Sequence, residues 1–426
     1  MPTIFKNVLR MALIGLLINS LFVQCQKNIT GEDALGDRLL YSFSQGSAGF
    51  YYNPPTLAAN HVYIGTSRRL HSEPAGDNYF FTLDLQLHKI WEYSLGAKEV
   101  RGSATVDNQG NVYFVVEAGR KNADVSESEL FLYALDAGGN FKWSKRIMSS
   151  PGVSELGMSN PALAADGTVY VGGDKFYAFD ATGHEQWTYG EALQVMNAPV
   201  IDPDGNIYFS TNGAVISLDA AGGERWRFDT SGECIASPAF ATDYQSVFVP
   251  VGNRIYRLES GTGHKIWEFS PDGISGGFRA TPAVDEENNV YAGTKADKQS
   301  VFYAIRADGS GLRWQNPVGA DLYSSPALGA DHVLYVGSEW STDRQIHLHA
   351  LDMQTGSAVW SASLAADVTW CSPALSPDGT VFIGTMAGDS PGGKLYAIRT
   401  DSPGLLPNAG SPRFHGGNAS TGRREP

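Results

Sequence analysis

A repeat with a period of about forty to fifty residues runs through this chain and constrains its fold more than any other feature. Two well-matched copies begin at Asn160, "NPALAADGTVYVGGDKFYAFDATGHEQW", and at Asn197, "NAPVIDPDGNIYFSTNGAVISLDAAGGERW". Further copies of the leading part begin at Ser237, Thr281, Ser325 and Ser372, and two more divergent copies begin at Pro54 and Ser103. The chain therefore contains eight copies of one structural unit.

Each copy has the composition of four short strands. An apolar strand is followed by a turn such as Asp166-Gly167 or Asp204-Gly205, an alternating strand such as "TVYVG", a third strand, and a glycine-containing turn that leads to a tryptophan strand. Aspartate followed by glycine between two alternating runs is typical of a tight hairpin. Units of four antiparallel strands at this period are typical of propeller blades, so the sequence predicts an all-β, eight-bladed β-propeller.

Seven of the eight units end in a tryptophan strand, with the tryptophans at positions Trp91, Trp143, Trp187, Trp226, Trp267, Trp314 and Trp360. The eighth unit ends without one, whereas the chain begins its repeats with a surplus strand, "LYSFSQG" from Leu40, which places Tyr41 at the tryptophan position. Pairing this strand with the last blade would cover an exposed strand edge. We therefore expect an N-terminal strand to complete the last blade and close the ring.

The repeats resemble the pyrroloquinoline-quinone-like propeller family of the tryptophan-docking type. The docking pattern of that family, Ala-x-Asp-x-x-Thr-Gly-x-x-x-Trp, is complete here from Ala350 to Trp360. The resemblance covers residues 39–426 and implies a single propeller whose tryptophans pack between neighbouring blades. Within the family, the chain is similar to the lipoprotein propellers of outer-membrane protein assembly, which implies a scaffold that holds partner segments by its rim loops.

The first residues have the layout of an export signal. Lys6 and Arg10 precede an apolar run that is too short to span a bilayer, and the run ends near Cys25. This arrangement resembles a bacterial lipoprotein box. We expect a signal peptide over residues 1–25 with lipid attachment at Cys25, a tether over 26–38 and the propeller over 39–426, in a lipoprotein of the outer membrane. The alternative is a plain secreted protein with an incidental cysteine.

Charge and cysteine content exclude several functions. The formal net charge is −14 and no basic stripe is present, which argues against nucleic-acid binding. Cys234 and Cys371 lie three repeat units apart, so we expect free thiols. The chain has no Cys-x-x-Cys pair that would indicate zinc or a c-type haem.

The residues just before the first strand of each blade are predicted to line the mouth of the central channel. Two arginines, three aromatic residues and two methionines at these positions form a candidate binding rim, and Ile235 occupies the eighth position. The rim residues are Tyr52, Arg101, Met158, Met196, Arg279, Tyr323 and Trp370. Long segments beginning at Thr66, Val116, Ser338 and Met386 are expected to form a wall on one side of this rim. The alternative is that these side chains only plug the channel.

Other candidate sites are weaker. "DPDGN" at residues 202–206 imitates part of a calcium loop, but its position favours a hairpin turn. His347 and His349 share one face of a strand and have no third metal ligand in view. Quinoprotein dehydrogenases of the family use the propeller to hold the quinone and calcium, but they are longer and carry an adjacent cysteine pair, which this chain lacks. No cofactor is predicted, with pyrroloquinoline quinone and calcium as the alternative.

These observations favour a non-catalytic, exported propeller that works as a protein-binding scaffold in the bacterial envelope. We expect a monomeric ring whose partners are envelope proteins or peptide segments, attached to the membrane through its lipid anchor. The C-terminal "SPRFHGGNASTGRR" resembles a capping segment and is expected to pack on the last blade. The alternatives are a quinone-dependent oxidoreductase and a glycan-binding surface protein.

Overall fold

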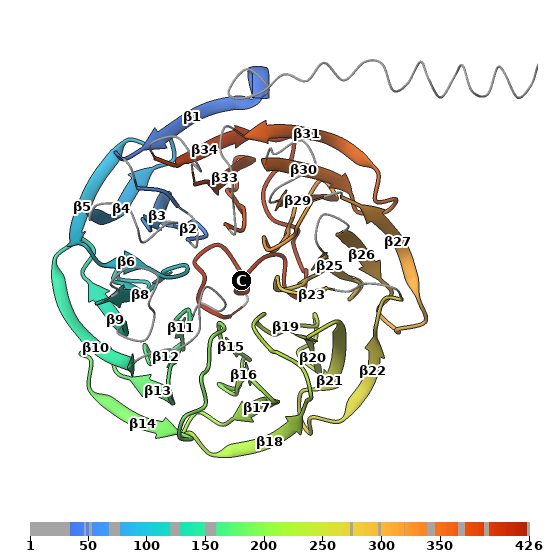
Figure 1. Cartoon of the computed structure of the whole chain (residues 1–426), viewed down its shortest axis with the longest axis horizontal. Coiled ribbons are helices and arrows are strands. Elements are labelled where there is room, and N and C mark those ends of the chain that lie inside the picture. The colour runs from blue at the N-terminus through green and yellow to red at the C-terminus, as the bar shows by residue number, and fades with distance from the viewer. Residues whose placement is uncertain are drawn as a thin grey trace, which may run out of the picture.

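The predicted propeller is confirmed by a computed structural model, which describes residues 35–46, 48–50, 53–67, 77–119, 128–149, 159–272, 276–296, 300–318, 320–338, 346–364, 371–386 and 392–423. Eight antiparallel sheets surround a central axis (Figure 1). In seven sheets the strands follow in sequence order from the channel outwards, and in the eighth the N-terminal strand is outermost; two of the sheets carry one short additional strand. The fold is all-β, and the described residues include one short 3-10 helix, η1 (Gly36–Arg38), before the first strand.

The first four blades follow one another along the chain from the channel outwards. They are blade one with β2 (Thr56–Ala58), β3 (His61–Gly65), β4 (Asn78–Asp84) and β5 (Lys89–Gly96); blade two with β6 (Glu99–Val100), β7 (Thr105–Val106), β8 (Val112–Ala118), β9 (Glu129–Leu135) and β10 (Phe141–Ser149); blade three with β11 (Ala162–Leu163), β12 (Val169–Gly172), β13 (Phe176–Phe179) and β14 (Glu185–Tyr189); and blade four with β15 (Val200–Ile201), β16 (Ile207–Thr211), β17 (Ala214–Leu218) and β18 (Glu224–Asp229).

The second half of the ring repeats this plan. It consists of blade five with β19 (Ala239–Phe240), β20 (Ser246–Val251), β21 (Arg254–Glu259) and β22 (Lys265–Phe269); blade six with β23 (Gly277–Phe278), β24 (Ala283–Val284), β25 (Val290–Lys295), β26 (Val301–Ile305) and β27 (Leu312–Pro317); blade seven with β28 (Ala327–Leu328), β29 (Val333–Ser338), β30 (Ile346–Asp352) and β31 (Ala358–Leu364); and blade eight with β32 (Ala374–Leu375), β33 (Thr380–Gly384), β34 (Lys394–Arg399) and β1 (Leu39–Ser44).

The ring is closed by the N-terminal strand, as predicted. β1 pairs antiparallel with β34 and places Tyr41 opposite Ala397. Trp360 of blade seven lies opposite Ala350 in the same register, so Tyr41 occupies the tryptophan position of blade eight. Closure covers the outer edge of β34, which would otherwise present unpaired backbone groups.

The hairpin turns follow from aspartate and glycine at fixed positions. In blade four, the Oδ1 atom of Asp202 accepts the backbone N–H groups of Asp204 at 3.0 Å and Asn206 at 2.8 Å. Gly205 has a φ of +85°, a conformation that glycine adopts without steric cost. The "DPDGN" stretch is therefore an aspartate-capped turn, as its position in the repeat indicated.

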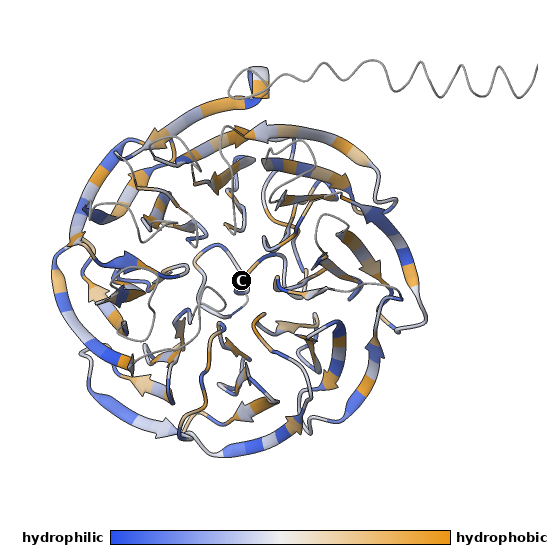
Figure 2. Cartoon of the chain, in the orientation of Figure 1, coloured by the Kyte–Doolittle hydropathy of each residue, from blue (hydrophilic) through white to orange (hydrophobic). Residues whose placement is uncertain are grey.

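The hydrophobic core is divided among the eight interfaces between neighbouring blades. One cluster of buried side chains fills each interface. The inner strands are buried on both faces, as in β16, whereas the outer strands, such as β18, alternate between buried and exposed positions. Figure 2 accordingly shows more polar residues on the outermost strands than on the strands inside them. Each blade thus depends on both neighbours for its core.

The docking tryptophans connect each blade to the next. The indole N–H groups of six of them donate to carbonyl oxygens of the following blade at 2.7–3.2 Å, on Ala137, Ala181, Ala220, Ser260, Ala307 and Met353. Trp360, the seventh, lies under the guanidinium of Arg38, 5.0 Å from the ring centroid. Arg38 also pairs with Asp401 of blade eight at 3.3 Å, so the segment that closes the ring also contacts the last docking position.

The C-terminal segment, residues 402–423, crosses the central channel and bonds to every blade (Figure 1). Backbone N–H groups of the innermost strands donate to it from Leu57, Val106, Leu163, Ile201, Val284 and Leu328. Phe240 donates its N–H to the Ser411 hydroxyl at 2.9 Å, and the Asn418 side chain donates to the Leu375 carbonyl at 2.8 Å. The prediction that this segment packs on the last blade was therefore too narrow, because it satisfies the open inner edges of the whole ring.

Candidate functional site

A pocket lies at the mouth of the central channel. The space between its lining residues, counted together with the open solvent at its mouth, is about 510 Å³, and the lining comes from all eight blades and from the C-terminal segment. Phe414, 9% exposed, contributes to this lining from the segment that crosses the channel. The pocket is consequently a concave site with one side provided by the segment that bonds to every blade.

A belt of hydrogen bonds between blades runs along much of the pocket wall. In five of the repeats, as far as the structure describes them, the residue that precedes the proline position donates its backbone N–H to the side-chain oxygen of the equivalent residue in the next blade. The described bonds are Ala198 to Ser237 at 2.9 Å, Ser237 to Thr281 at 3.1 Å, Thr281 to Ser325 at 3.0 Å and Ser325 to Ser372 at 2.9 Å, with Ser103 to Asn160 earlier in the ring. The belt fixes the spacing of the blades at the pocket wall.

Two of the predicted rim residues, Arg279 and Tyr323, line the pocket together with Ile235. The guanidinium of Arg279 donates from Nη1 to Glu233 at 2.7 Å, and its side chain remains 24% exposed. The pocket wall thus combines a cationic group with an aromatic and an aliphatic side chain, a composition suited to polar and apolar contacts with one partner.

Arg101 and Met196 lie elsewhere. Arg101 is 8% exposed and forms a buried ion pair with Glu117, with Glu99 at 3.7 Å on its other side. Met196 packs against the cluster between blades two and three. Neither residue belongs to the pocket lining in the described part of the chain.

The other predicted site residues, Tyr52, Met158 and Trp370, lie outside the described residues, as do Cys25 and most of the long segments expected to form a wall.

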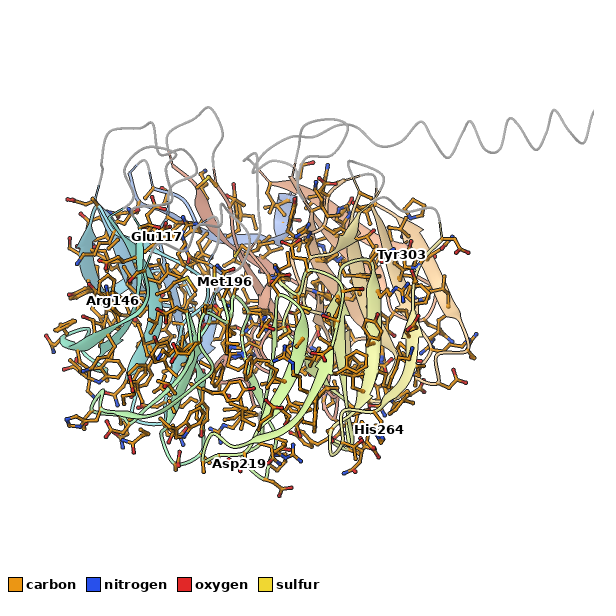
Figure 3. All side chains as sticks on the ribbon, turned by 60° about the horizontal axis from the view of Figure 1, so that its bottom comes forward. Glu117, Arg146, Met196, Asp219, His264 and Tyr303 are labelled. Atoms are coloured by element: carbon orange, nitrogen blue, oxygen red, sulfur yellow. The ribbon has the colours of Figure 1, made fainter. Side chains whose placement is uncertain are left out.

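The two faces of the propeller can be told apart in Figure 3. The labelled Asp219 and His264, which belong to turns before outer strands, lie toward the opposite face of the propeller from Met196 and Glu117. The connections between the second and third strands of blades three to five are described and are short turns.

The histidine pair is packed in a blade. The rings of His347 and His349 are 5.7 Å apart, and the Nε2 atom of His349 contacts the Ser338 hydroxyl at 2.9 Å. Burial lowers the pKa of His349 to about 3, which keeps this imidazole neutral. Among the residues that the structure describes, no group of three or more histidine, cysteine or acidic side chains could hold a metal ion.

The described lining of the pocket does not fit the quinone and calcium that the resemblance offered as the alternative. It contains no aspartate or glutamate, the residues that would hold calcium and serve as a catalytic base. Cys234 and Cys371 are buried free thiols, as predicted, and neither lies in the lining. Within the described ranges, no helix is long and apolar enough to cross a membrane.

The belt residues were missed by the sequence interpretation. Their signal was present in the recurring serine, threonine or asparagine before proline, as in "NPA", "SPA" and "TPA" at residues 160, 237 and 281. In the sequence alone, this position stands out only as part of the repeat pattern. Its role emerges when the strands converge on the axis and bring equivalent positions of neighbouring blades into hydrogen-bonding distance.

The fold and the site define an eight-bladed, tryptophan-docked propeller with a pocket at the channel mouth. The family whose model matches is described as "Outer membrane protein assembly factor BamB", and it matches residues 41–225, 177–273 and 251–422. The chain belongs to this family, which confirms the resemblance seen in the repeats.

Solved structures share the architecture. BamB from Moraxella catarrhalis is 15% identical with a TM-score of 0.60, covering 84% of this chain and 99% of that one. The C-terminal WD40 domain of Sif2 is 10% identical with a TM-score of 0.61, covering 85% and 99%. These likenesses show the fold alone. A serine/threonine-protein kinase, AfsK of Streptomyces griseus, is 30% identical over 142 residues, which are 30% of this chain and only 17% of the kinase.

Proposed function

We propose that this protein is a non-catalytic binding scaffold of the bacterial envelope that holds a segment of a partner protein at the channel mouth. The observation that carries the proposal is the pocket itself, which Arg279 and Tyr323 line together with residues of the hydrogen-bond belt. Such a pre-formed pocket can bind an extended segment with little ordering of its own side chains.

Membership of the family supports a role in the assembly of outer-membrane proteins, because the matching family is described by that role. We propose the same for this chain, exported by residues 1–25 and anchored through a lipid on Cys25. The proposal includes no quinone or metal, since the pocket lining provides a guanidinium, hydroxyls and amides in place of a set of carboxylates.

Site-specific photocrosslinking tests the scaffold function. p-Benzoylphenylalanine is introduced at position 323 in the pocket and, as a matched control, at position 266, where Ile266 is 52% exposed on the outer strand β22. After irradiation in envelope membranes, position 323 should yield a defined protein adduct that position 266 lacks.

The adduct should disappear when an excess of wild-type protein competes for the partner. An equal excess of the Arg279→Glu variant should compete poorly, because that variant reverses the charge at the pocket wall. Identical adducts at both positions, or none at position 323, would overturn the proposed function.

A further inference from the structure

Four of the five acceptor side chains in the hydrogen-bond belt are hydroxyls, and among the described residues their protons have no protein acceptor. Ser237, Thr281, Ser325 and Ser372, here termed the hydroxyl arc, come from the four consecutive blades five to eight and all line the pocket. They are only 2–4% exposed. Each oxygen accepts a backbone N–H from the preceding blade at 2.9–3.1 Å.

A hydroxyl group has one proton to donate in addition to the lone pairs that accept. In the part of the chain that the structure describes, none of the four hydroxyls of the arc donates to a protein acceptor. Buried polar groups are nearly always satisfied in folded proteins. The arc therefore presents four hydrogen-bond donors to whatever occupies the pocket.

The charge of the pocket indicates which acceptor fits these donors. Arg279 lines the same pocket, and its guanidinium has five N–H donors, of which Nη1 binds Glu233. The described lining contains no carboxylate that would favour a cation. Hydroxyl and guanidinium donors bind carboxylate oxygens more strongly than neutral ones, since charge-assisted hydrogen bonds are about twice as strong.

We infer that the hydroxyl arc and Arg279 form a binding site for a carboxylate group supplied by the partner segment. This inference rests on the proposed function and names the chemistry that the partner brings to the pocket. The carboxylate comes from the C-terminus of a polypeptide or from an acidic side chain, and both place two oxygens within reach of several donors.

Saturation-transfer NMR with sodium propionate tests the site, with propionamide as the neutral molecule of nearly the same shape. Propionate should bind at least tenfold more tightly than propionamide. The Thr281→Val variant should weaken propionate binding about tenfold, as expected for one charge-assisted hydrogen bond.

Thr294→Val is the matched control, because Thr294 lies in the same blade, is fully buried and also accepts a backbone N–H, from Val301 at 3.2 Å, outside the pocket. This variant should bind propionate like the wild type. Should Thr281→Val fail to fold, as judged by circular dichroism, Arg279→Gln provides the second variant. Equal binding of propionate and propionamide, or equal loss in the pocket and control variants, would overturn the inference.

Two peptides distinguish the sources of the carboxylate. N-acetyl-triglycine carries a free C-terminus, whereas N-acetyl-Gly-Asp-Gly-amide carries only an acidic side chain, and the tighter binder identifies the source. The scaffold function and the carboxylate site can fail separately. If propionate binds but position 323 gives no crosslinks, the carboxylate site stands and the scaffold function is refuted. If position 323 gives crosslinks but propionate does not bind, the scaffold function stands and the carboxylate site is refuted.

Discussion

The contact between each docking tryptophan and the glycine of the next blade can be tested at Gly222, which lies in the turn of blade four beneath Trp187 of blade three. A Cβ atom built on Gly222 would lie 2.7 Å from Cδ2 of Trp187, well inside an ordinary carbon contact. Gly222 also has a φ of +86°, so alanine would be strained there even without the tryptophan.

Gly167 separates these two effects. Its φ is +90°, nearly that of Gly222, but a Cβ at this position would meet nothing within 4 Å. Gly167→Ala should therefore lower the free energy of unfolding by about 1–2 kcal/mol, the cost of left-handed backbone for alanine. Gly222→Ala should cost this amount plus about 1–3 kcal/mol for overpacking against the indole ring. The gain from a less flexible unfolded chain applies to both variants and cancels in the comparison.

Urea unfolding followed by circular dichroism measures both variants, and a third arm places Gly222→Ala in a Trp187→Leu background. There the extra cost of Gly222→Ala should disappear, because the smaller side chain leaves room for the Cβ. Equal losses for Gly167→Ala and Gly222→Ala, or an extra cost that persists without the indole, would refute the reasoning.

Three further predictions concern buried groups. Burial lowers the pKa of His415 to about 4, so its contribution to stability is complete above pH 6.5 and is lost as the pH falls toward 4. The free energy of unfolding should fall by about 2–3 kcal/mol more between pH 7 and 4.5 in the wild type than in His415→Gln, and parallel pH profiles would contradict this. Arg413 is fully buried and donates to the carbonyls of Pro55, Gly417 and Asn418. Arg413→Met should lower the free energy of unfolding by about 3–5 kcal/mol, because it removes a charged donor from three carbonyl acceptors. It should also speed amide exchange in the innermost strands, whereas unchanged exchange would show that the segment is held without Arg413. Burial raises the pKa of Cys371 to about 12 and also raises that of Cys234, so both thiols should react with a disulfide reagent at pH 8 only after unfolding, and rapid reaction of the native protein would count against their burial.

The strand order and the closure of the ring were accessible from the sequence because they depend on local chemistry. Aspartate and glycine at the turns, alternating strands and a regularly placed tryptophan act within one repeat or between adjacent repeats. The surplus strand at Tyr41 could be assigned by counting. The last blade lacks its outer strand and the N-terminus has one strand too many, so the ring closes only if the N-terminal strand joins the last blade. The register of Tyr41 opposite Ala397 confirms that reasoning.

The composition of the pocket was decided only by the tertiary structure. Arg101 and Arg279 hold equivalent positions in the repeat, but Arg101 is drawn into a buried ion pair with Glu117 while Arg279 lines the pocket. The C-terminal segment likewise contains little that predicts contact with all eight blades. Its role follows from the convergence of eight inner strand edges on one axis, where unpaired N–H groups far apart in the sequence meet the same short stretch of chain. The repeated residue types of each blade therefore determined the ring, whereas the convergence of the inner strands on the axis, seen only in the tertiary structure, determined the site.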